Sequence, residues 1–237
     1  MKSKTHFHFK RFSVSHLGSA MKVGTDAVLL GAWANIDRAT HILDIGTGNG
    51  TIALILAQRS EEHSKIDAVE IAKDESVRAR ENFKNSPWPH KINLQHSAIQ
   101  EYFPSVKYDL IVCNPPYFNN SLIPPRSDRG RARHTIELTY RELISSATRL
   151  LTEDGKFNVI LPFAEGLQFI SYAEQEMLFC SRQYSFKTRP QKDVERWLLE
   201  FSKRKSVPET GEILLYKESD IWDESYVTLT KDFYIKL

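Results

Sequence analysis

Short apolar runs alternate with segments of helical spacing along most of the chain. The apolar runs predict buried strands at 41–45, 65–71, 92–96, 108–113 and 156–161. The segments between and around them predict helices at 25–33, 51–59, 74–85, 138–150 and 165–177. Thr25 or Asp26 is the expected N-cap of the first helix. Alternating strands and helices indicate an α/β fold, a parallel sheet with helices on both faces.

The two ends of the chain have different patterns. After residue 177, segments 197–202 and 212–216 have the composition of strands, and 226–229 is considered as a further strand. Strands without intervening helices predict an antiparallel addition at one edge of the sheet. Residues 1–20 are basic and aromatic without clear periodicity, and we expect an N-terminal extension on a single domain of residues 1–237.

Composition narrows the class of protein. Hydrophobic residues make up 41% of the chain, enough for a core, and the net charge is only +2. We find no signal-peptide pattern and no apolar run long enough to span a membrane. Two cysteines, Cys113 and Cys180, are too few for a disulfide framework or a structural zinc site. We therefore expect a cytoplasmic monomer without a bound metal.

The first candidate site is a glycine-rich loop, DIGTGNG at 44–50, between a predicted strand and a predicted helix. Glycines permit a sharp turn and the close approach of a ligand, and the helix N-terminus presents free N–H groups. Glu70 ends the next strand, where a carboxylate can accept hydrogen bonds from both hydroxyls of a ribose. The spacing differs from the G-x-G-x-x-G of dinucleotide-binding loops. The sequence therefore predicts a site for an adenosine-bearing ligand at Asp44, Gly46, Gly48, Gly50 and Glu70.

This loop, together with Glu70, resembles the cofactor loop of class I S-adenosylmethionine methyltransferases. The resemblance implies a Rossmann-like fold, with a seven-stranded, mostly parallel sheet and an antiparallel C-terminal strand. It also implies that Ile71 packs on the cofactor adenine. Many members place an Asp after the third strand to bind the adenine amine, whereas this chain has Ser97 there, so the Ser97 hydroxyl or the Ala98 backbone is expected to serve.

The second candidate site is Asn-Pro-Pro-Tyr at 114–117, directly after a predicted strand. Carboxyl ends of parallel strands meet at one edge, so this motif is expected beside the glycine loop. The prolines remove N–H donors, so carbonyl oxygens and the side-chain oxygen of Asn114 remain to accept the two hydrogens of an amino group. Tyr117 offers a face on which a planar base can stack. The motif is similar to motif IV of amino-group methyltransferases, which implies catalytic roles for Asn114, Pro115 and Tyr117, with Asn114 also at the cofactor.

Cations near this motif suggest a nucleic-acid substrate. The loop 118–134 carries four arginines that suit phosphates, namely Arg126, Arg129, Arg131 and Arg133. The N-terminal extension sets Lys10 and Arg11 between aromatic residues, a pattern that can contact phosphates and stack bases. Phe118 is expected at the wall of the base pocket. A solvated loop and an apolar strap on the domain surface remain open as alternatives for the two segments.

Taken together, FHFKRF, KVGTDAVLLGAW, DIGTGNG, NPPYF and ARHT resemble the bacterial tRNA1(Val) (adenine-N6)-methyltransferases over about residues 5–200. The resemblance implies methyl transfer from S-adenosylmethionine to N6 of an adenosine beside the anticodon of a tRNA. It also implies that Thr25 and Asp26 lie near the methionine end of the cofactor.

The motifs leave other functions open. A ribosomal RNA guanine N2-methyltransferase and a release-factor glutamine N5-methyltransferase share the logic of the Asn-Pro-Pro-Tyr motif. A non-catalytic RNA-binding protein of the same fold is a further alternative. Residues 205–237 carry no specific motif.

Overall fold

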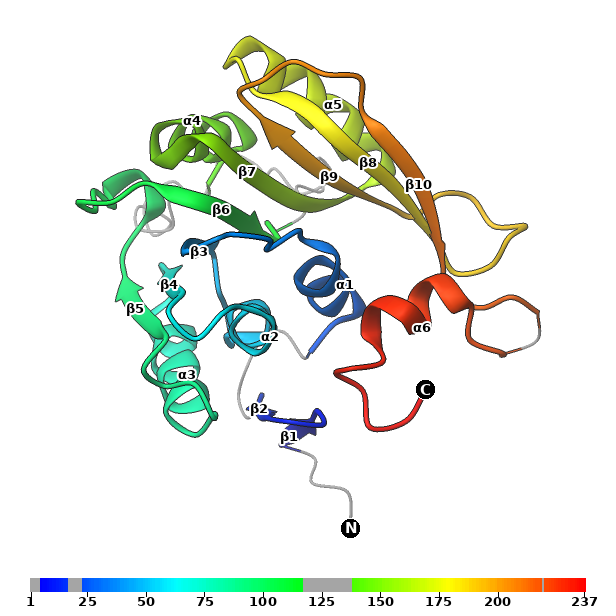
Figure 1. Ribbon diagram of the computed structural model, residues 1–237, viewed down its shortest axis with the longest axis horizontal. Coiled ribbons are helices and arrows are strands. Elements are labelled where there is room, and N and C mark those ends of the chain that lie inside the picture. Colours follow the sequence, from blue (N-terminus) through cyan, green and yellow to red (C-terminus); the bar gives the residue numbers. More distant parts are fainter. Residues whose placement is uncertain (1–4, 17–22, 117–137, 219) are drawn as a thin grey trace, which may run out of the picture.

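The computed structural model describes residues 5–16, 23–116, 138–218 and 220–237. Its main sheet has eight strands in the order β10-β8-β9-β7-β6-β3-β4-β5 (Figure 1). The strands are β3 (His41–Ile45), β4 (Lys65–Glu70), β5 (Ile92–His96), β6 (Tyr108–Cys113), β7 (Leu151–Pro162), β8 (Phe179–Lys187), β9 (Arg196–Ser202) and β10 (Glu209–Leu214). Only β9 is antiparallel to its two neighbours, β7 and β8. The predicted Rossmann-like class is confirmed, with β10 as one strand more than the seven expected.

Helices cover both faces of this sheet (Figure 1). On one face lie α1 (Thr25–Trp33), α2 (Thr51–Arg59) and α3 (Lys73–Lys84), and on the other α4 (Tyr140–Leu150) and α5 (Phe163–Gln175). Two buried apolar clusters, one per face, fill the space between sheet and helices. Strand residues alternate between the clusters, as the two-residue period of a strand requires: Leu110 and Val112 join one, Ile111 and Cys113 the other. None of the helices in the described ranges is long and apolar enough to cross a lipid bilayer.

Two sequence predictions are wrong. Segment 226–229 is not a strand but part of α6 (Glu224–Thr230). The Asp223 side chain caps this helix by accepting a hydrogen bond from Ser225 N, and Tyr226 and Thr230 are buried one turn apart. The N-cap of α1 is Gly24, and no side chain caps the helix.

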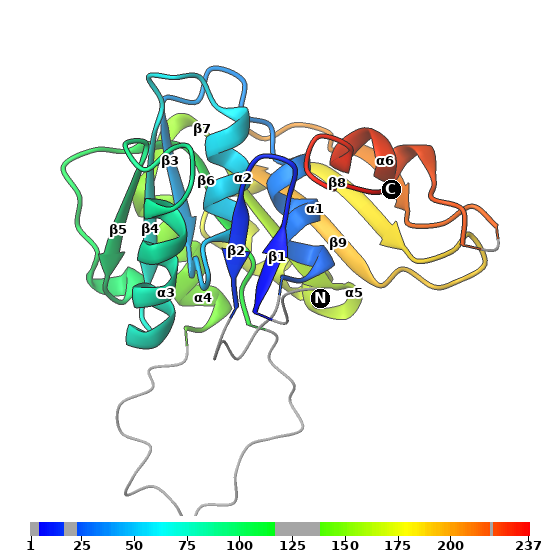
Figure 2. The ribbon, with the colours of Figure 1, turned by 90° about the horizontal axis from the view of Figure 1, so that it is seen from below.

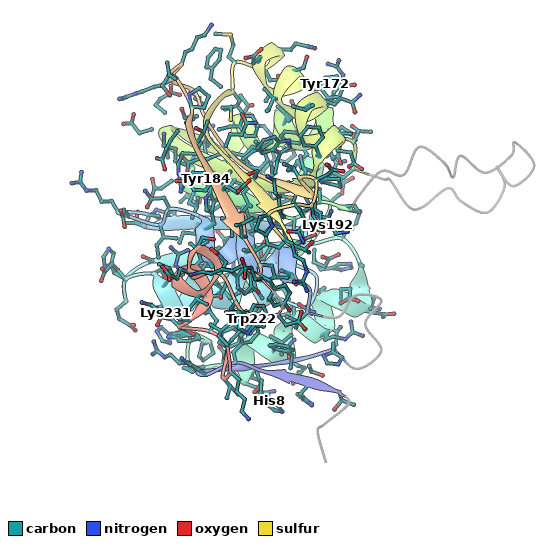
Figure 3. The ribbon with its side chains drawn as sticks, turned by 90° about the vertical axis from the view of Figure 1, so that its right-hand side faces the viewer. His8, Tyr172, Tyr184, Lys192, Trp222 and Lys231 are labelled. Carbon is teal, nitrogen blue, oxygen red and sulfur yellow. The ribbon has the colours of Figure 1, made fainter. Side chains whose placement is uncertain are left out.

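The C-terminal residues hold the N-terminal extension in place. The extension forms a hairpin of β1 (His6–His8) and β2 (Ser13–Ser15). Phe9 forms a β-bridge with Tyr234, and Lys10 N donates to the carbonyl of Phe233 at 2.8 Å. Figure 3 shows the layers, from Tyr172 on α5 through Tyr184 on the sheet to Trp222 and Lys231, with His8 of the hairpin beneath. Segment 205–237, which has no motif, therefore completes the sheet edge and anchors the hairpin.

Candidate functional site

The glycine loop at 46–50 adopts a backbone that other residues disfavour. Gly46, Gly48 and Gly50 have φ angles of +68°, +55° and +85°, in the left-handed region. A Cβ atom on Gly50 would lie 2.4 Å from Cε1 of Phe83, so this position excludes side chains by space as well. Around Gly46 and Gly48, a Cβ would meet nothing within 4 Å. The loop thus passes tightly over α3 at one end and is open to a ligand at the other.

Asp44 is a buried carboxylate beneath this loop. It is 0% exposed, and its Oδ2 accepts hydrogen bonds from Thr47 Oγ1 at 2.6 Å and Ala53 N at 3.1 Å. Its Oδ1 is buried and has no hydrogen-bond partner among the described residues. Burial raises the pKa of the Asp44 carboxyl to about 7 despite those two hydrogen bonds. A buried acceptor without a partner is costly, so Asp44 suits a ligand that brings a donor or a positive charge.

Glu70 connects the glycine loop to the end of β4. Its Oε2 accepts from Gly48 N at 2.8 Å, and its Oε1 accepts from Ala72 N at 2.7 Å. A carboxylate has about four lone-pair sites, so two acceptor positions remain for other donors such as ribose hydroxyls. Gly46 N and Thr47 N donate to the carbonyl of Val69, which fixes the loop to the same strand.

Two asparagines support the loop, Asn49 from within it and Asn82 from α3, and the sequence motifs assigned a role to neither. Asn82 Nδ2 donates to the carbonyl of Asn49 at 2.8 Å, and Asn82 Oδ1 accepts from Ser15 N at 2.9 Å. Asn49 Oδ1 accepts from Thr51 Oγ1 at 2.7 Å. Asn82 thereby joins the hairpin to the loop. A polar residue in the apolar stripe of α3, next to Phe83, is the signal that could have identified it.

The Asn-Pro-Pro motif lies beside the loop because β6 pairs with β3. Ile45 is in register with Cys113, so Asn114 follows at the level of Gly46. Asn114 is half-buried, Pro115 buried and Pro116 exposed. Burial raises the pKa of the Cys113 thiol, and the nearby carboxylates of Asp44 and Glu70 raise it further, so Cys113 is a neutral core thiol. The structure thus brings Asp44, Glu70 and Asn114 together at the carboxyl ends of three strands.

Several predicted residues lie outside the described ranges. They are Tyr117, Phe118, Arg126, Arg129, Arg131 and Arg133.

The residues proposed for the cofactor adenine gather next to Glu70. Ile71 is 49% exposed although it is apolar. Ser97 N donates to the carbonyl of Glu70 at 3.1 Å, because β5 pairs with β4. The Ser97 hydroxyl donates to the carbonyl of Ala98 at 3.0 Å, which leaves its oxygen as an acceptor. An exposed apolar surface beside an acceptor is a suitable environment for an adenine ring with its amino group.

Asp26, at the start of α1, has an ion-pair partner that sequence reasoning missed. Arg196 Nε lies 2.9 Å from Asp26 Oδ2, and both side chains are only partly exposed. Arg196 begins β9 and is in register with Pro162, the last residue of β7, so the pair lies at the carboxyl edge of the sheet. Thr25, next to Asp26, is exposed. The two partners are 170 residues apart in the sequence, and no local pattern predicts such a contact.

Lys10 and Arg11 lie at the amino ends of the parallel strands, opposite the end that carries the glycine loop. They occupy the turn of the β1–β2 hairpin, at the upper end in Figure 2. There they line an open groove of about 600 Å³ with Ile36, Asp37, Gln58, Arg59 and Asp232. Residues 36–37 precede β3 and Arg59 ends α2, whereas the glycine loop follows β3 and begins α2. Lys10 Nζ donates to the carbonyl of Lys231, and Arg11 stacks on Trp88.

The site as a whole fits the cofactor that the resemblance implies. S-adenosylmethionine carries a ribose, an adenine and positive charge. Glu70 has acceptor positions left, Ile71 offers apolar surface, and the Oδ1 atom of Asp44 is buried without a partner in the described residues. The described residues contain no group of three or more His, Cys, Asp and Glu side chains that could hold a metal ion.

Comparison with known proteins gives the family. The model of the "Methyltransferase small domain" family matches residues 19–178. A tRNA1(Val) (adenine(37)-N6)-methyltransferase of Trichodesmium erythraeum is 42% identical over 97% of this chain and 98% of its own. A protein of the same name from Parabacteroides distasonis is 41% identical over 98% of each chain.

Solved structures agree on the fold. A protein from Agrobacterium tumefaciens described as a predicted O-methyltransferase superposes with a TM-score of 0.70, at 17% identity over 88% of this chain and 96% of its own. A ribosomal protein L11 methylase from Lactobacillus delbrueckii gives a TM-score of 0.58, at 16% identity over 79% and 83% of the two chains. With the family model covering more than half of the chain and curated relatives aligned over nearly all of it, the chain belongs to the methyltransferase small domain family and, within it, to the tRNA1(Val) (adenine(37)-N6)-methyltransferases.

Proposed function

We propose that this enzyme transfers a methyl group from S-adenosylmethionine to N6 of an adenosine in tRNA, the nucleotide beside the anticodon of tRNA1(Val). One observation carries the proposal: pairing of β3 with β6 sets Asn114 and Pro115 at the level of Gly46, directly beside the glycine loop. The relatives at about 40% identity bear the name of this reaction over nearly their full length. The cofactor supplies an electrophilic methyl carbon on a sulfonium centre.

The chain's own residues do the remaining work. The Asn114 side-chain oxygen and the Pro115 carbonyl are acceptors for the two hydrogens of the adenine amino group. An amino group on an aromatic ring is a poor nucleophile because its lone pair is delocalised into the ring. Two acceptors favour a pyramidal nitrogen whose lone pair points at the methyl donor, and holding the reactants in line lowers the barrier further. No strong base is required before the methyl group moves.

The substrate contacts are proposed from the sequence. Tyr117 stacks on the target adenine, Phe118 forms part of the pocket wall, and the arginines of loop 118–134 bind phosphates. An anticodon loop presents unstacked bases, so a target base can enter such a pocket at low cost. Lys10 and Arg11 at the distant hairpin turn would contact only a more remote part of the tRNA. We infer further that the enzyme acts as a monomer in the cytoplasm.

Mass spectrometry of nucleosides tests the reaction. Total tRNA from a strain lacking the gene is incubated with pure protein and S-adenosylmethionine, in parallel with ribosomal RNA and a release factor. New N6-methyladenosine in one tRNA is the expected result. New N2-methylguanosine in ribosomal RNA, or a methylated glutamine amide, would replace the proposed substrate. No cofactor binding by calorimetry would instead favour a non-catalytic RNA-binding protein.

A salt titration tests the arginine loop. Replacing Arg129, Arg131 and Arg133 by alanine should weaken tRNA binding and flatten the slope of log affinity against log salt. The slope should decrease by about 0.7–0.9 for each phosphate that the variant no longer neutralises. An unchanged slope would mean that the loop does not bind phosphates.

A further inference from the structure

The position of the cofactor loop restricts the direction from which the substrate can reach Asn114. Along the carboxyl edge, β3 and β4 carry the glycine loop and Glu70 on one side of β6. The proposed function places the cofactor on that side. The other side of β6 is formed by β7 and then β9. A base held by Asn114 and the nucleotides attached to it must therefore lie over the carboxyl end of β7 and the start of β9.

An exposed aromatic surface occupies this position. Phe163 directly follows the last residue of β7, begins α5, and is 42% exposed. Its ring lies over the indole of Trp197 at 5.6 Å between centroids and 27° between planes. Trp197 is held by register pairing with Leu161 on β7. The stacked rings of Phe163 and Trp197, which we call the platform, thus lie over the paired strands β7 and β9.

Helix α5 is adapted to hold the two rings together. A Cβ on Gly166 would lie 2.7 Å from Cδ1 of Trp197, so only glycine lets the helix lie this close to the indole. Gly166 and Phe163 come from the same turn of α5, which places Phe163 over a fixed ring. Leu167, one turn after Phe163, is 49% exposed. A single exposed apolar residue on a protein surface needs no functional explanation. Phe163 and Leu167, however, together form an exposed apolar strip beside the site.

The charges around the platform are internally balanced, which argues for stacking rather than phosphate binding. Three basic side chains at the ends of β8 and β9 have acidic partners: Lys187 pairs with Glu212, Arg189 with Asp220 and Arg196 with Asp26. In the loop between these strands Lys192, labelled in Figure 3, is followed by Asp193 and Glu195. An RNA base that stacks on Phe163 needs no counter-charge.

We propose that the Phe163–Trp197 platform stacks a base of the RNA that flanks the target adenosine, so that the strand is held next to the reacting nucleotide. The inference rests on the proposed function, because it requires an RNA substrate. Asn114 lies opposite residue 160 by register, and β7 continues to Pro162, about 7 Å farther at the strand rise of 3.3 Å per residue, before Phe163 begins α5. That span exceeds the length of one adenine ring, so the stacked base is a neighbour of the target.

The test compares Phe163→Ala with Phe163→Tyr and with Phe103→Ala. Phe103 is also an exposed phenylalanine, at 73%, but lies before β6 at the opposite edge of the sheet. We expect Phe163→Ala to raise KM for an anticodon stem-loop about tenfold, within the range for loss of one stacked base. The Kd for S-adenosylmethionine, kcat and the salt slope should stay as in the unaltered enzyme. Phe163→Tyr and Phe103→Ala should leave KM within twofold.

Abasic RNA identifies the stacked nucleotide. Single bases are removed in turn on either side of the target, and at one position the removal should raise KM as much as Phe163→Ala does. For RNA without that base, Phe163→Ala should cause no further increase in KM. A KM for Phe163→Ala within twofold of the unaltered enzyme would overturn the inference. So would independent effects at every position, in which the KM increases from Phe163→Ala and from base removal multiply. Failure of the unaltered enzyme to methylate or bind the RNA would count against the proposed function instead, so the two failures are distinguishable.

Discussion

The two halves of the carboxyl edge are built in different ways. On the cofactor side, the two carboxylates take their contacts from nearby segments: Thr47 to Asp44, and Gly48 to Glu70 across 22 residues. On the substrate side, β7 and β9 bring together residues from distant parts of the chain, and Arg196 meets Asp26 across 170 residues. The cofactor half is a preformed loop whose backbone N–H groups are already hydrogen-bonded, and it lies beside two carboxylates that have acceptor positions left. The substrate half is an exposed surface of rings and balanced ion pairs.

This difference shows how the fold divides two tasks. A single cofactor of fixed shape is best served by a rigid loop whose hydrogen bonds are already made. An RNA segment needs a broader surface, and its components can be spread over several elements. The predictions below change one half while leaving the other intact.

The largest effect is expected at the boundary between the halves. Asn114→Ala removes an acceptor for the reacting amino group, and we expect kcat to fall by at least about 10²–10³-fold, as when one preorganised hydrogen-bonding group is removed from an active site. The Kd for S-adenosylmethionine should change little, because the contacts of Asp44 and Glu70 persist. Single-turnover kinetics and calorimetry measure the two quantities. Asn93→Ala, at an exposed asparagine on β5, is the control; full activity of Asn114→Ala would refute the mechanism.

The next largest effect concerns the cofactor half alone. Gly50→Ala forces a side chain onto a φ of +85° and brings its Cβ to 2.4 Å from the Phe83 ring. We expect the free energy of unfolding to fall by about 2–3 kcal/mol, from backbone strain and overpacking, with weaker cofactor binding. Gly24→Ala is the matched control, because a Cβ there meets nothing within 4 Å. Chemical denaturation of both variants gives the comparison, and equal stabilities would contradict it.

The same contrast explains what the sequence could predict. The bounds of β3, α2, β5 and β6 are as predicted, because apolar runs between glycines and prolines are local signals. The loop residues Asp44, Gly46, Gly48 and Glu70 were identified in the same way, and the structure brings them together. Their binding roles remain predictions.

The substrate half was less predictable for a physical reason. Arg196 and Trp197 reach the carboxyl edge only because β9 lies antiparallel between β7 and β8, a pairing that no local pattern specifies. Segment 226–229 has the composition of a strand, but Asp223 caps a helix there, and Tyr226 and Thr230 are the buried residues of that helix. Lys10 and Arg11 have the composition of an RNA-binding segment, yet the hairpin turns them toward the edge away from Asn114. Composition alone does not show which edge of the sheet a segment will face.

The pH dependence of cofactor binding tests the buried carboxylate. Asp44 has an ordinary pKa of 3.8 when unfolded and about 7 when buried in the folded protein. Between these values the folded protein binds the extra proton, so its stability falls as pH rises toward 7 and stays level above it. A cofactor with positive charge favours the ionised form. Its affinity should therefore rise up to tenfold per pH unit below about 7 and reach a plateau above that pH.

Calorimetry from about pH 5.5 to about pH 8.5 measures this dependence, with proton release on binding below about pH 7. Asp44→Asn should remove the pH dependence and lower the affinity at about pH 8, where the unaltered carboxylate is ionised. Without cofactor, the same variant should be more stable than the unaltered protein at that pH, by about 1–2 kcal/mol, because no charge is buried. Asp154→Asn, at an exposed aspartate, should keep the original profile. A flat profile in the unaltered protein would show that Asp44 does not bind positive charge.

The smallest effect is expected from the long-range ion pair. Arg196→Gln removes the partner of Asp26 at the start of α1, and we expect KM for S-adenosylmethionine to rise about two- to fivefold, the range of a partly exposed pair worth up to about 1 kcal/mol. Arg182→Gln is the control, because Arg182 pairs with Glu200 and stacks on Trp33 at the other end of α1. It should reduce stability without changing that KM. If both variants changed KM equally, Arg196 would act only through the general stability of the sheet. If only Arg196→Gln does so, a residue on the substrate side positions the cofactor, and the two halves are coupled through α1.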